Sequence, residues 1–534
     1  MSAAEPRARS WPCPTGAEMR AIERDAIERL GIPAGDLMET AGRAVAEAIA
    51  RHFPDARSPL IVCGGGNNGG DGYVAARVLA GQGRGVAPVV LDLAGRGSQS
   101  PEAKRNRERL ESSGVRVELA DGPHAISELL GACDLVVDAI FGTGLTRPVE
   151  GRTAEVMRAL AASGLPCVAV DLPSGLSSET GRPLGLALDA DLIVSFGHAK
   201  FGLALLPTRA RILVAEIGLP AESVERATVR AHVLSSEAAR ALLPARPLAG
   251  HKGSFGHVLV VGGSPGKTGA VLLAAQGALR GGAGLVSLAA PRSLLSIYAS
   301  RLAEAMCVVL DDSAAGDSTG LLGVPHVDTL VRELASRDAL VLGPGLGTHT
   351  SSAALARELL ARTNVPAVVD ADGLNAFAAE PEGLRSTAPR ILTPHPGEAA
   401  RLLGTSTEAI GSDRAAAARA IAARSGAITV LKGARSVIAA PGGEICVNPT
   451  GGPGLAAGGS GDVLAGLLGA LLAQRLGAWD AARIGTYLHG LAGDLGPDSG
   501  GLASELASRI PSARQALLSR EARPDEPGTL RSFP

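Results

Sequence analysis

Short runs of valine, isoleucine and leucine alternate with alanine- and arginine-rich stretches along almost the whole chain, in two successive series. The first series runs from 60–66 to 210–218, and the second from 257–264 to 427–433. Continuous apolar runs of this length predict strands that are buried on both faces, as in a parallel sheet covered by helices. The expected fold class is therefore α/β, with two tandem doubly wound domains of three layers each.

A stretch with little strand pattern separates the two series. It covers 227–240 and contains only a short apolar pair at 233–234. The predicted organisation is a first domain over 1–226, a linker over 227–240 and a second domain over 241–518. The polar, proline-containing end of the chain, 519–534, is expected to be a disordered tail.

Composition narrows the range of partners. Lys and Arg number 51 against 53 Asp and Glu, and aromatic residues are only 2%, so the chain lacks the basic field and stacking platforms of a nucleic-acid binder. The longest apolar stretch, 463–473, is too short to span a bilayer, and the N-terminus has no signal-peptide core. The six cysteines form no CxxC pair. We expect a soluble cytoplasmic protein that acts on small molecules, with no membrane or nucleic-acid partner.

The densest motif of the first series is the segment 63–72, which contains six glycines, two asparagines and one aspartate. It follows a strand and precedes the helix expected over 73–81. Glycines let the backbone approach a ligand closely, and N–H groups at a helix start favour an anion. The segment lacks the GxGxxG spacing of dinucleotide-binding proteins and the lysine of a P-loop.

Oxygen-bearing side chains recur at the ends of the neighbouring strands. Asp138 and Ser174 follow two of these strands, and Asn68 lies in the glycine-rich segment. Amide, carboxylate and hydroxyl oxygens together suit a hard cation, and a single carboxylate favours a monovalent one. Taken singly, each of these residues is more often a cap or turn residue.

The segments VCGGGNNGGDGYVAARVL, DLVVDAIFGTGLTRPVEG, VAVDLPSGL and SFGHAKFGL resemble, in order, the motifs of the NAD(P)H-hydrate epimerase domain. The resemblance covers 18–220 and implies a Rossmann-like domain that interconverts the R and S forms of hydrated NAD(P)H. It implies a potassium ion held by Asn68, Asp138 and Ser174. Asp171 is the expected catalytic residue, with Asp71 as the other candidate. The implied substrate contacts are Asn67, Asn68, Gly69, Gly70, Asp71, Gly142, Thr143, Gly144, Leu145, Thr146, Arg147, Pro148 and Asp171.

The second series is followed by another helix start whose groups could take part in catalysis. The segment GLAAGGSGD places Asp462 at the beginning of the apolar helix expected over 463–473. A carboxylate beside free backbone N–H groups can take a proton from a hydroxyl that attacks a phosphate. Lys432 and Arg435 follow a strand and could neutralise phosphates, and His395 lies between two prolines at another strand end.

The segments HKGSFGHVLVVGGS, LVLGPGLG, VVDADGLN, LTPHPGEAARLL, VLKGARSVI and GGSGDVLAG resemble the ADP-dependent NAD(P)H-hydrate dehydratase, a member of the ribokinase-like superfamily, over 241–515. The resemblance implies ADP or ATP as co-substrate, with Mg²⁺. It implies contacts with the hydrated nicotinamide nucleotide from Ala270, Gly345, His395 and Asp462. The implied nucleotide-binding residues are Lys432, Gly433, Ala434, Arg435, Ser436 and Gly461.

These resemblances together predict a bifunctional repair enzyme. The first domain would epimerise hydrated NADH (NADHX) and hydrated NADPH (NADPHX). The second would phosphorylate the ring hydroxyl, with Asp462 as the base, and eliminate phosphate to restore NAD(P)H. Such enzymes tend to be homo-oligomers.

Two alternatives remain at this stage. A ribokinase-like kinase for a vitamin precursor or sugar shares the GxGD arrangement, although the HKGxFG and TPHPGE pair favours the dehydratase. The first domain could also be a binding module without catalytic activity.

Overall fold

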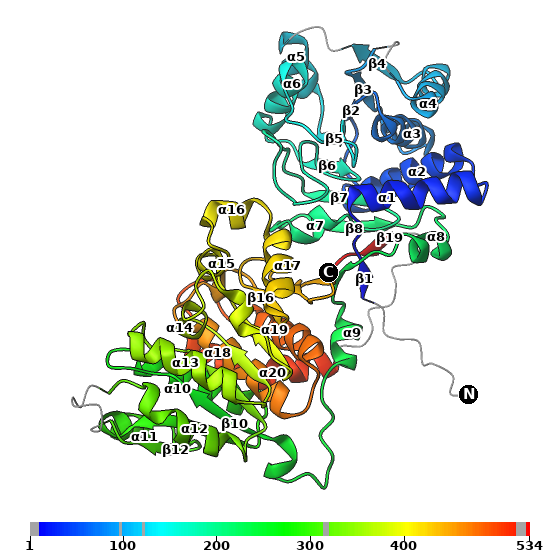
Figure 1. Cartoon of the computed structure of the whole chain (residues 1–534). Helices are drawn as coiled ribbons and strands as arrows, with labels where there is room; N and C mark the ends of the chain where they lie inside the picture. Colours follow the sequence, from blue (N-terminus) through cyan, green and yellow to red (C-terminus); the bar gives the residue numbers. More distant parts are fainter. Residues whose placement is uncertain (1–9, 96–98, 120–122, 313–319, 520–529) are drawn as a thin grey trace. The chain divides into compact units, whose positions relative to one another are not determined.

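The computed structural model describes residues 10–95, 99–119, 123–312, 320–519 and 530–534 (Figure 1). The chain divides into two compact units. Residues 11–232 and 530–534 form the N-terminal unit, and residues 233–519 form the C-terminal unit. The boundary falls after His232, within the range expected for the linker. That range includes a strand, β9 Ala231–Val233, and the start of a helix, α9 Ser236–Ala241.

The N-terminal unit contains a sheet in the order β19-β8-β7-β6-β5-β2-β3-β4. Neighbouring strands are parallel, except that β19 pairs antiparallel with β8. The strand order reverses between β2 and β5, and ligands of such folds bind at the carboxyl ends of the strands at this point. The strands are β2 Pro59–Cys63, β3 Val89–Asp92, β4 Arg116–Leu119, β5 Leu135–Ala139, β6 Cys167–Val170, β7 Leu192–Phe196, β8 Arg211–Ala215 and β19 Leu530–Ser532.

Two separate apolar cores cover the faces of this sheet. Ile61 and Cys63 of β2 pack with α2, α3 and α4, whereas Leu60 and Val62 pack with α5 and α6. Alternate residues of a strand point to opposite faces, so β2 must be apolar throughout. The helices are α1 Gly16–Arg24, α2 Ala34–His52, α3 Asn67–Gly81, α4 Pro101–Ser112, α5 Pro123–Ala132, α6 Gly151–Ala162, α7 Phe201–Leu205 and α8 Ala221–Arg226, with a π-helical turn, Asp25–Arg29, after α1.

Helix α3 begins earlier than the sequence predicts. It starts at Asn67 rather than at Tyr73, so the residues of the NNGGDG motif form its first turns. The glycines there meet protein backbone. A Cβ on Gly69 would lie 1.9 Å from the carbonyl oxygen of Gly64, and one on Gly64 would lie 2.0 Å from that of Ile140. These two glycines therefore permit close packing of the loop on the sheet.

The prediction of a disordered tail over 519–534 is wrong at both ends of that range. Ser519 is the last residue of a helix, and Leu530–Ser532 form β19, whose Leu530 is fully buried. Residues 520–529 lie outside the described residues. Strand β8 would otherwise form an edge of the sheet. The three residues of β19, the first of which is apolar, cover that edge and extend the sheet by one strand.

The C-terminal unit contains a second sheet, in which the order β18-β17-β16-β15-β14-β13-β10-β11-β12 is continuous. Strands from β16 to β12 are parallel, and the hairpin strands β17 and β18 are antiparallel. The order reverses between β13 and β10. The strands are β10 His257–Val261, β11 Leu285–Pro291, β12 Met306–Leu310, β13 Ala339–Leu342, β14 Ala367–Val369, β15 Arg390–Leu392, β16 Ile428–Leu431, β17 Val437–Ala439 and β18 Ile445–Val447.

Helices cover this second sheet as well. Val258 and Val260 of β10 belong to a large core with α10, α18, α19 and α20, and the alternate residues Leu259 and Val261 are equally buried. The doubly wound α/β prediction is thus confirmed for both units. The helices of eight or more residues are α10 Thr268–Arg280, α12 Val327–Leu334, α13 Thr350–Arg362, α15 Pro396–Leu403, α17 Arg414–Ser425, α18 Ser460–Ala473, α19 Ala478–Asp494 and α20 Ala503–Ser519, and the short ones include α11 Leu295–Arg301, α14 Asp372–Asn375 and α16 Thr407–Ser412.

Helix α18 contains the longest apolar run of the sequence and is buried in the core of the unit. No helix among the described residues has the length and apolarity needed to cross a membrane. All six cysteines are free thiols.

Candidate active sites

The first site lies at the carboxyl ends of β2, β5 and β6. Asp138, in β5, is fully buried and accepts hydrogen bonds from the hydroxyl and backbone N–H of Ser174, at 2.5 Å and 2.7 Å. The N–H of Ile140 donates to the same carboxylate at 3.3 Å. Burial raises the pKa of Asp138 to about 6, although these hydrogen bonds act to lower it. The structure therefore brings two of the predicted cation ligands together.

Asn68 is the third predicted ligand. Its side chain is buried, and its Nδ2 has no hydrogen-bond partner within the described part of the chain. A Cβ on Gly142 would lie 3.2 Å from Oδ1 of Asn68 and 3.5 Å from Oδ2 of Asp171. Only glycine leaves this space open, and the two oxygens that face it are of the kind that hard cations and hydroxyl groups contact.

The residues present fit a monovalent cation better than a transition metal. Asn68, Asp138 and Ser174 offer one carboxylate and neutral oxygens, which suit K⁺. Within the described ranges, no group of three or more His, Cys, Asp or Glu side chains could hold a metal ion.

Asp171 follows β6 in a left-handed backbone conformation, with φ of 66°. Its Oδ1 accepts hydrogen bonds from the N–H of Phe196 at 3.1 Å, from Ser195 Oγ at 3.3 Å and from the ammonium of Lys200. Lys200 is only 1% exposed and precedes α7. Non-glycine residues in this conformation are strained and cluster at functional sites.

Two further carboxyl groups surround Asp171. Burial raises the pKa of Asp71 well above its ordinary range, and the negative charges of Asp171 and Glu23 raise it further. Burial also raises the pKa of Glu23, against an opposing effect of Lys200. The site therefore combines a carboxylate in an ion pair with a carboxyl group whose pKa is raised, an arrangement typical of acid–base catalysis.

The remaining predicted epimerase residues lie along the same edge of the sheet. Asn67 accepts a hydrogen bond from Ser100 Oγ at 2.7 Å, and the carbonyl of Thr143 accepts one from Arg20 at 2.8 Å. The loop from Gly142 to Pro148 follows β5, and its residues Thr146 and Arg147 are exposed. The loop therefore begins at the end of a strand that forms the site, and its substrate contacts stay a prediction.

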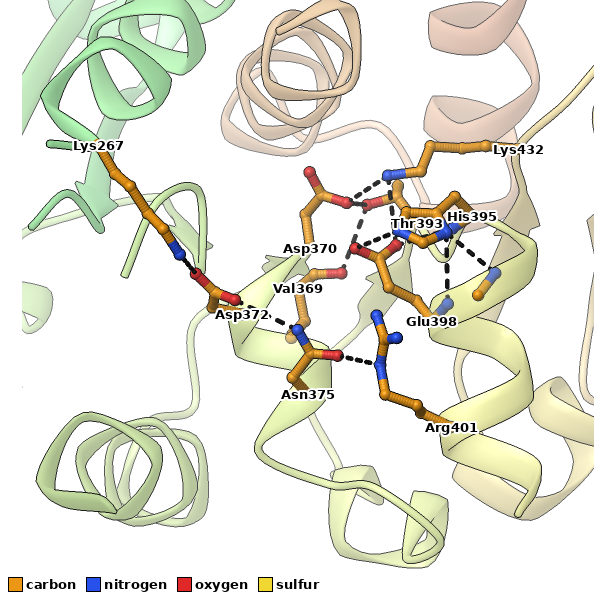
Figure 2. Close-up of polar contacts among 11 residues, drawn as sticks. Lys267, Val369, Asp370, Asp372, Asn375, Thr393, His395, Glu398, Arg401 and Lys432 are labelled. Atoms are coloured by element: carbon orange, nitrogen blue, oxygen red, sulfur yellow. Dashed lines mark hydrogen bonds and ion pairs between the residues drawn. The ribbon is translucent and has the colours of Figure 1, made fainter. Parts of the chain in front are cut away.

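The second site lies at the carboxyl ends of β14, β15 and β16 (Figure 2). Lys432 Nζ lies 2.8 Å from Asp370 Oδ1 and 3.6 Å from Glu398 Oε2. Thr393 Oγ1 donates to the same oxygen of Asp370 at 2.8 Å. Burial alone would lower the pKa of Lys432, but attraction from the two carboxylates outweighs it and raises that pKa. The lysine is thus held as a cation whose side chain is 19% exposed.

His395 has a structural role in addition to its predicted substrate contact. Its Nδ1 accepts hydrogen bonds from the N–H groups of Gly397 at 3.0 Å and Glu398 at 3.3 Å, and Oε2 of Glu398 accepts one from the N–H of His395 at 2.7 Å. This is a capping box at the start of α15. The imidazole is half exposed, and its Nε2 lies 3.4 Å from Glu398 Oε1.

Asp462 lies in the first turn of α18, where backbone N–H groups have no partner within the helix. Burial, together with the negative charges of Asp370, Glu398 and Asp372, raises the pKa of Asp462 to about 7, against an opposing effect of Lys432. A Cβ on Gly461 would lie 3.3 Å from Lys432 Nζ. The structure therefore assembles the predicted base, the helix start and Lys432 in one site.

Two predicted substrate residues lie together at the switch between β10 and β13. Gly345 has φ of 62°, and a Cβ there would lie 3.0 Å from that of Ala270 and 2.6 Å from the carbonyl oxygen of Lys267. Lys267 forms an ion pair with Asp372 at 3.1 Å, and Asp372 also accepts a hydrogen bond from the N–H of Gly347 at 2.9 Å. Figure 2 shows this pair on one side of the site and Lys432 on the other.

The predicted nucleotide loop, 432–436, follows β16 directly. Arg414 holds it by donating to the carbonyl of Ala434 at 2.5 Å, and Ser436 Oγ donates to the carbonyl of Gly433 at 3.0 Å. Arg435 has φ of 52° and donates to the carbonyl of Pro449 at 3.5 Å. The loop is fixed by these contacts, and its role in nucleotide binding stays a prediction.

Sequence reasoning missed several residues of both sites. Lys200, Glu23, Thr393 and Glu398 were not among the predicted site residues, although three of them lie inside segments that carried the resemblances. For Lys200 and Glu398, the available signal was a charged side chain at a helix start. The pairing of Lys200 with Asp171 is a tertiary contact, which no local pattern reveals.

Comparisons with known proteins agree with this geometry. Residues 258–515 match the family described as NAD(P)H-hydrate dehydratase, and residues 34–202 match the family described as YjeF-related protein N-terminus. The bifunctional NAD(P)H-hydrate repair enzyme of Moorella thermoacetica is 44% identical over 494 residues, which cover 90% of this chain and 91% of that protein. The enzyme of the same name from Escherichia coli is 34% identical over 514 residues, 94% of this chain and 93% of that protein.

A solved structure is also similar to the C-terminal part. It is the ADP/ATP-dependent NAD(P)H-hydrate dehydratase of Bacillus subtilis, co-crystallised with ATP and Mg²⁺, with 30% identity and a TM-score of 0.46. The match covers 53% of this chain and 98% of that one.

Proposed function

This chain belongs to the bifunctional NAD(P)H-hydrate repair enzymes, and on that premise we propose which of its residues carry each reaction. The family's two activities are epimerisation of the hydrates and their dehydration to NAD(P)H. The N-terminal unit is assigned the first activity, and the C-terminal unit the second. The observation that carries the assignment is the position of Asp462, at the start of α18 and beside the Lys432–Asp370–Glu398 cluster.

In dehydration, Asp462 acts as the general base. It takes the proton of the ring hydroxyl as that oxygen attacks the terminal phosphate of ADP or ATP, and the bond to the remaining nucleotide breaks. The phosphate then leaves the ring carbon, and a neighbouring carbon loses a proton, which restores the double bond. A pKa near 7 suits a general base at neutral pH.

The groups around Asp462 bind and neutralise the phosphates. The N–H groups at the start of α18, including that of Gly461, face the transferred phosphate, and Lys432 supplies a fixed positive charge. Loop 432–436 binds the remainder of the nucleotide. Asp370 and Glu398 carry the oxygen ligands that Mg²⁺ prefers, and when bound the ion neutralises phosphate charge. Ala270, Gly345 and His395 contact the hydrated nicotinamide nucleotide.

Epimerisation requires the C–O bond of the ring hydroxyl to break and re-form from the opposite face. Asp71, whose pKa is raised by burial, donates a proton to the hydroxyl. The hydroxyl leaves as water, and the ring nitrogen stabilises the cation that remains. Water then adds from the other face and gives a proton to Asp171. The proton then returns from Asp171 to Asp71 through water, which restores the starting state, so protons and charge balance over each turnover.

The cation site supports this reaction. Asn68, Asp138 and Ser174 would hold K⁺, which supplies a fixed positive charge beside the substrate when bound. Gly142 leaves room for the reacting group between Asn68 and Asp171. Asn67, Gly69, Gly70 and the loop from Thr143 to Pro148 contact the rest of the nucleotide.

The decisive experiment is a dehydration assay on the full chain. Hydrated NADH is incubated with ADP or ATP, and the absorbance band of reduced nicotinamide is followed, with Asp462→Asn as the control. Recovery of the band that depends on nucleotide and is lost in Asp462→Asn supports the assignment. No recovery, with turnover of a vitamin alcohol by ATP, would instead favour a ribokinase-like kinase.

The location and the quaternary structure are also part of the proposal. Six free thiols suit the reducing cytoplasm. Strand β12 is an edge strand of its sheet and exposes Met306 to 45%, and an edge strand of this kind suits pairing with a second copy. Light scattering of the protein and of Met306→Lys tests the homo-oligomer, since a monomeric wild type would contradict it.

A further inference from the structure

The carboxylate of Asp171 has one anchored oxygen and one open oxygen. Oδ1 accepts hydrogen bonds from Lys200, Ser195 and Phe196. Oδ2 receives no hydrogen bond from any described residue, and it lies 3.5 Å from the position of a Cβ on Gly142. The open oxygen therefore faces the space beside Asn68 where the reacting group is assigned.

Lys200 has no donor left for a substrate. Its ammonium donates to Asp171, to Ser195 Oγ at 3.2 Å and to the carbonyl of Phe196 at 2.9 Å, which uses its three N–H groups. The side chain is 1% exposed. It can therefore act on the reaction only through Asp171.

The other charged groups near Asp171 cannot replace this lysine. Asp71 of α3 and Glu23 of α1 both carry carboxyl groups, whose charge would repel that of Asp171. The positive charge of Arg20 lowers the pKa of Glu23, and the Arg20 guanidinium donates a hydrogen bond to the carbonyl of Thr143. A buried carboxylate without a counter-charge takes up a proton or turns toward solvent.

We infer that Lys200 is a positioning residue for epimerisation: it holds Asp171 through Oδ1, so that Oδ2 is directed at the ring hydroxyl beside Gly142. The inference rests on the proposed role of Asp171 and adds the residue on which that role depends. The strained backbone of Asp171 is part of the same arrangement, because it directs the side chain back toward the end of β7.

The test uses the full chain and follows conversion of the R hydrate of NADH into the S hydrate by chromatography, without nucleotide. Lys200→Met should lower kcat by about 100-fold while KM changes by less than about threefold, because binding contacts remain and only the acid–base group is displaced. Lys200→Arg keeps the charge and should recover at least about tenfold of that loss. Dehydration of the S hydrate with ADP, measured on the same preparations, should be unchanged.

A second variant, which changes the site less, keeps the inference testable if Lys200→Met does not fold. Ser195→Ala removes a hydroxyl that lies 3.3 Å from Oδ1 of Asp171 and 3.2 Å from the carbonyl oxygen of His198, without removing charge, and should lower kcat about fivefold at unchanged KM. The matched control is Ser223→Ala, which also removes a buried hydroxyl bonded to an aspartate, Asp25, at 2.8 Å, but away from the site. Its kcat should equal that of the wild type.

The outcomes separate the two claims. Wild-type kcat in both Lys200→Met and Ser195→Ala would overturn the positioning role of Lys200. Equal losses in Ser195→Ala and Ser223→Ala would also overturn it, since a general loss of packing would then explain both. Wild-type epimerisation in Asp171→Asn would instead overturn the proposed role of Asp171 itself.

Discussion

The ammonium of Lys432 lies 2.8 Å from a carboxylate oxygen of Asp370, and the side chain of Asp370 is only 2% exposed. A carboxylate oxygen of Glu398, whose side chain is 5% exposed, lies 3.6 Å from the same ammonium. One cation therefore neutralises two buried carboxylates, at the place where a nucleotide phosphate is expected. Its removal should affect folding as well as binding.

Lys432→Met should destabilise the C-terminal unit by about 3–5 kcal/mol, because it leaves two buried carboxylates without a counter-charge. Urea unfolding, followed by a probe in that unit, measures the change. The double variant Lys432→Met with Asp370→Asn should lose less than the sum of the single losses. Additive losses would show that the pair is not coupled.

Dehydration should depend on pH through Asp462. Its pKa of about 7 means that the base is protonated below that pH, so kcat/KM should fall about tenfold per pH unit on the acid side and level off above. Profiles with saturating ADP between pH 5 and pH 9 measure this. Asp328→Asn, an exposed change on α12, should keep the profile, and a flat wild-type profile would contradict the role of Asp462.

Potassium dependence should require Asn68. Its Nδ2 has no partner in the described structure, so Asn68→Ala breaks no hydrogen bond of that group but removes a cation ligand. Conversion of the R hydrate should then lose its stimulation by KCl over tetramethylammonium chloride, and the rate should fall by at least about tenfold. A variant that KCl still stimulates fully would place the cation elsewhere.

The strand β19 should stabilise the N-terminal unit. Leu530→Ala deletes a fully buried side chain and should cost about 2–5 kcal/mol in that unit, with the midpoint of epimerase inactivation lowered. Ser532→Ala, an exposed position of the same strand, is the matched control and should change stability by less than about 0.5 kcal/mol. Equal stability of the two variants would contradict the packing of β19.

The strands and the positions of the sites were predictable because buried parallel strands have a strong local signature. Each apolar run of the two series contains a strand, and Asp138, Asp171 and Lys432 lie at or just past the strand ends where the sequence suggested. The start of α3 was missed because glycine and asparagine are poor helix formers, and tertiary packing on the sheet overrides that propensity.

What could not be predicted depends on contacts between distant segments. Glu398 and Lys432 are neighbours only because β15 and β16 pair in parallel. Strand β4, RVEL, has a weak apolar pattern because it lies at a sheet edge and is partly exposed. The pKa of Asp462 likewise depends on burial and on carboxylates from other strands, which sequence spacing does not encode.

The return of the chain to its first sheet also sets an order of synthesis. Leu530–Ser532 complete the β8 edge, yet a ribosome makes them only after the whole C-terminal unit. Until translation is complete, the β8 edge of the N-terminal sheet therefore lacks its neighbouring strand, β19. A gene cut at the unit boundary would separate this strand from its sheet, so an N-terminal unit expressed on its own should carry 530–534 joined through a linker after His232.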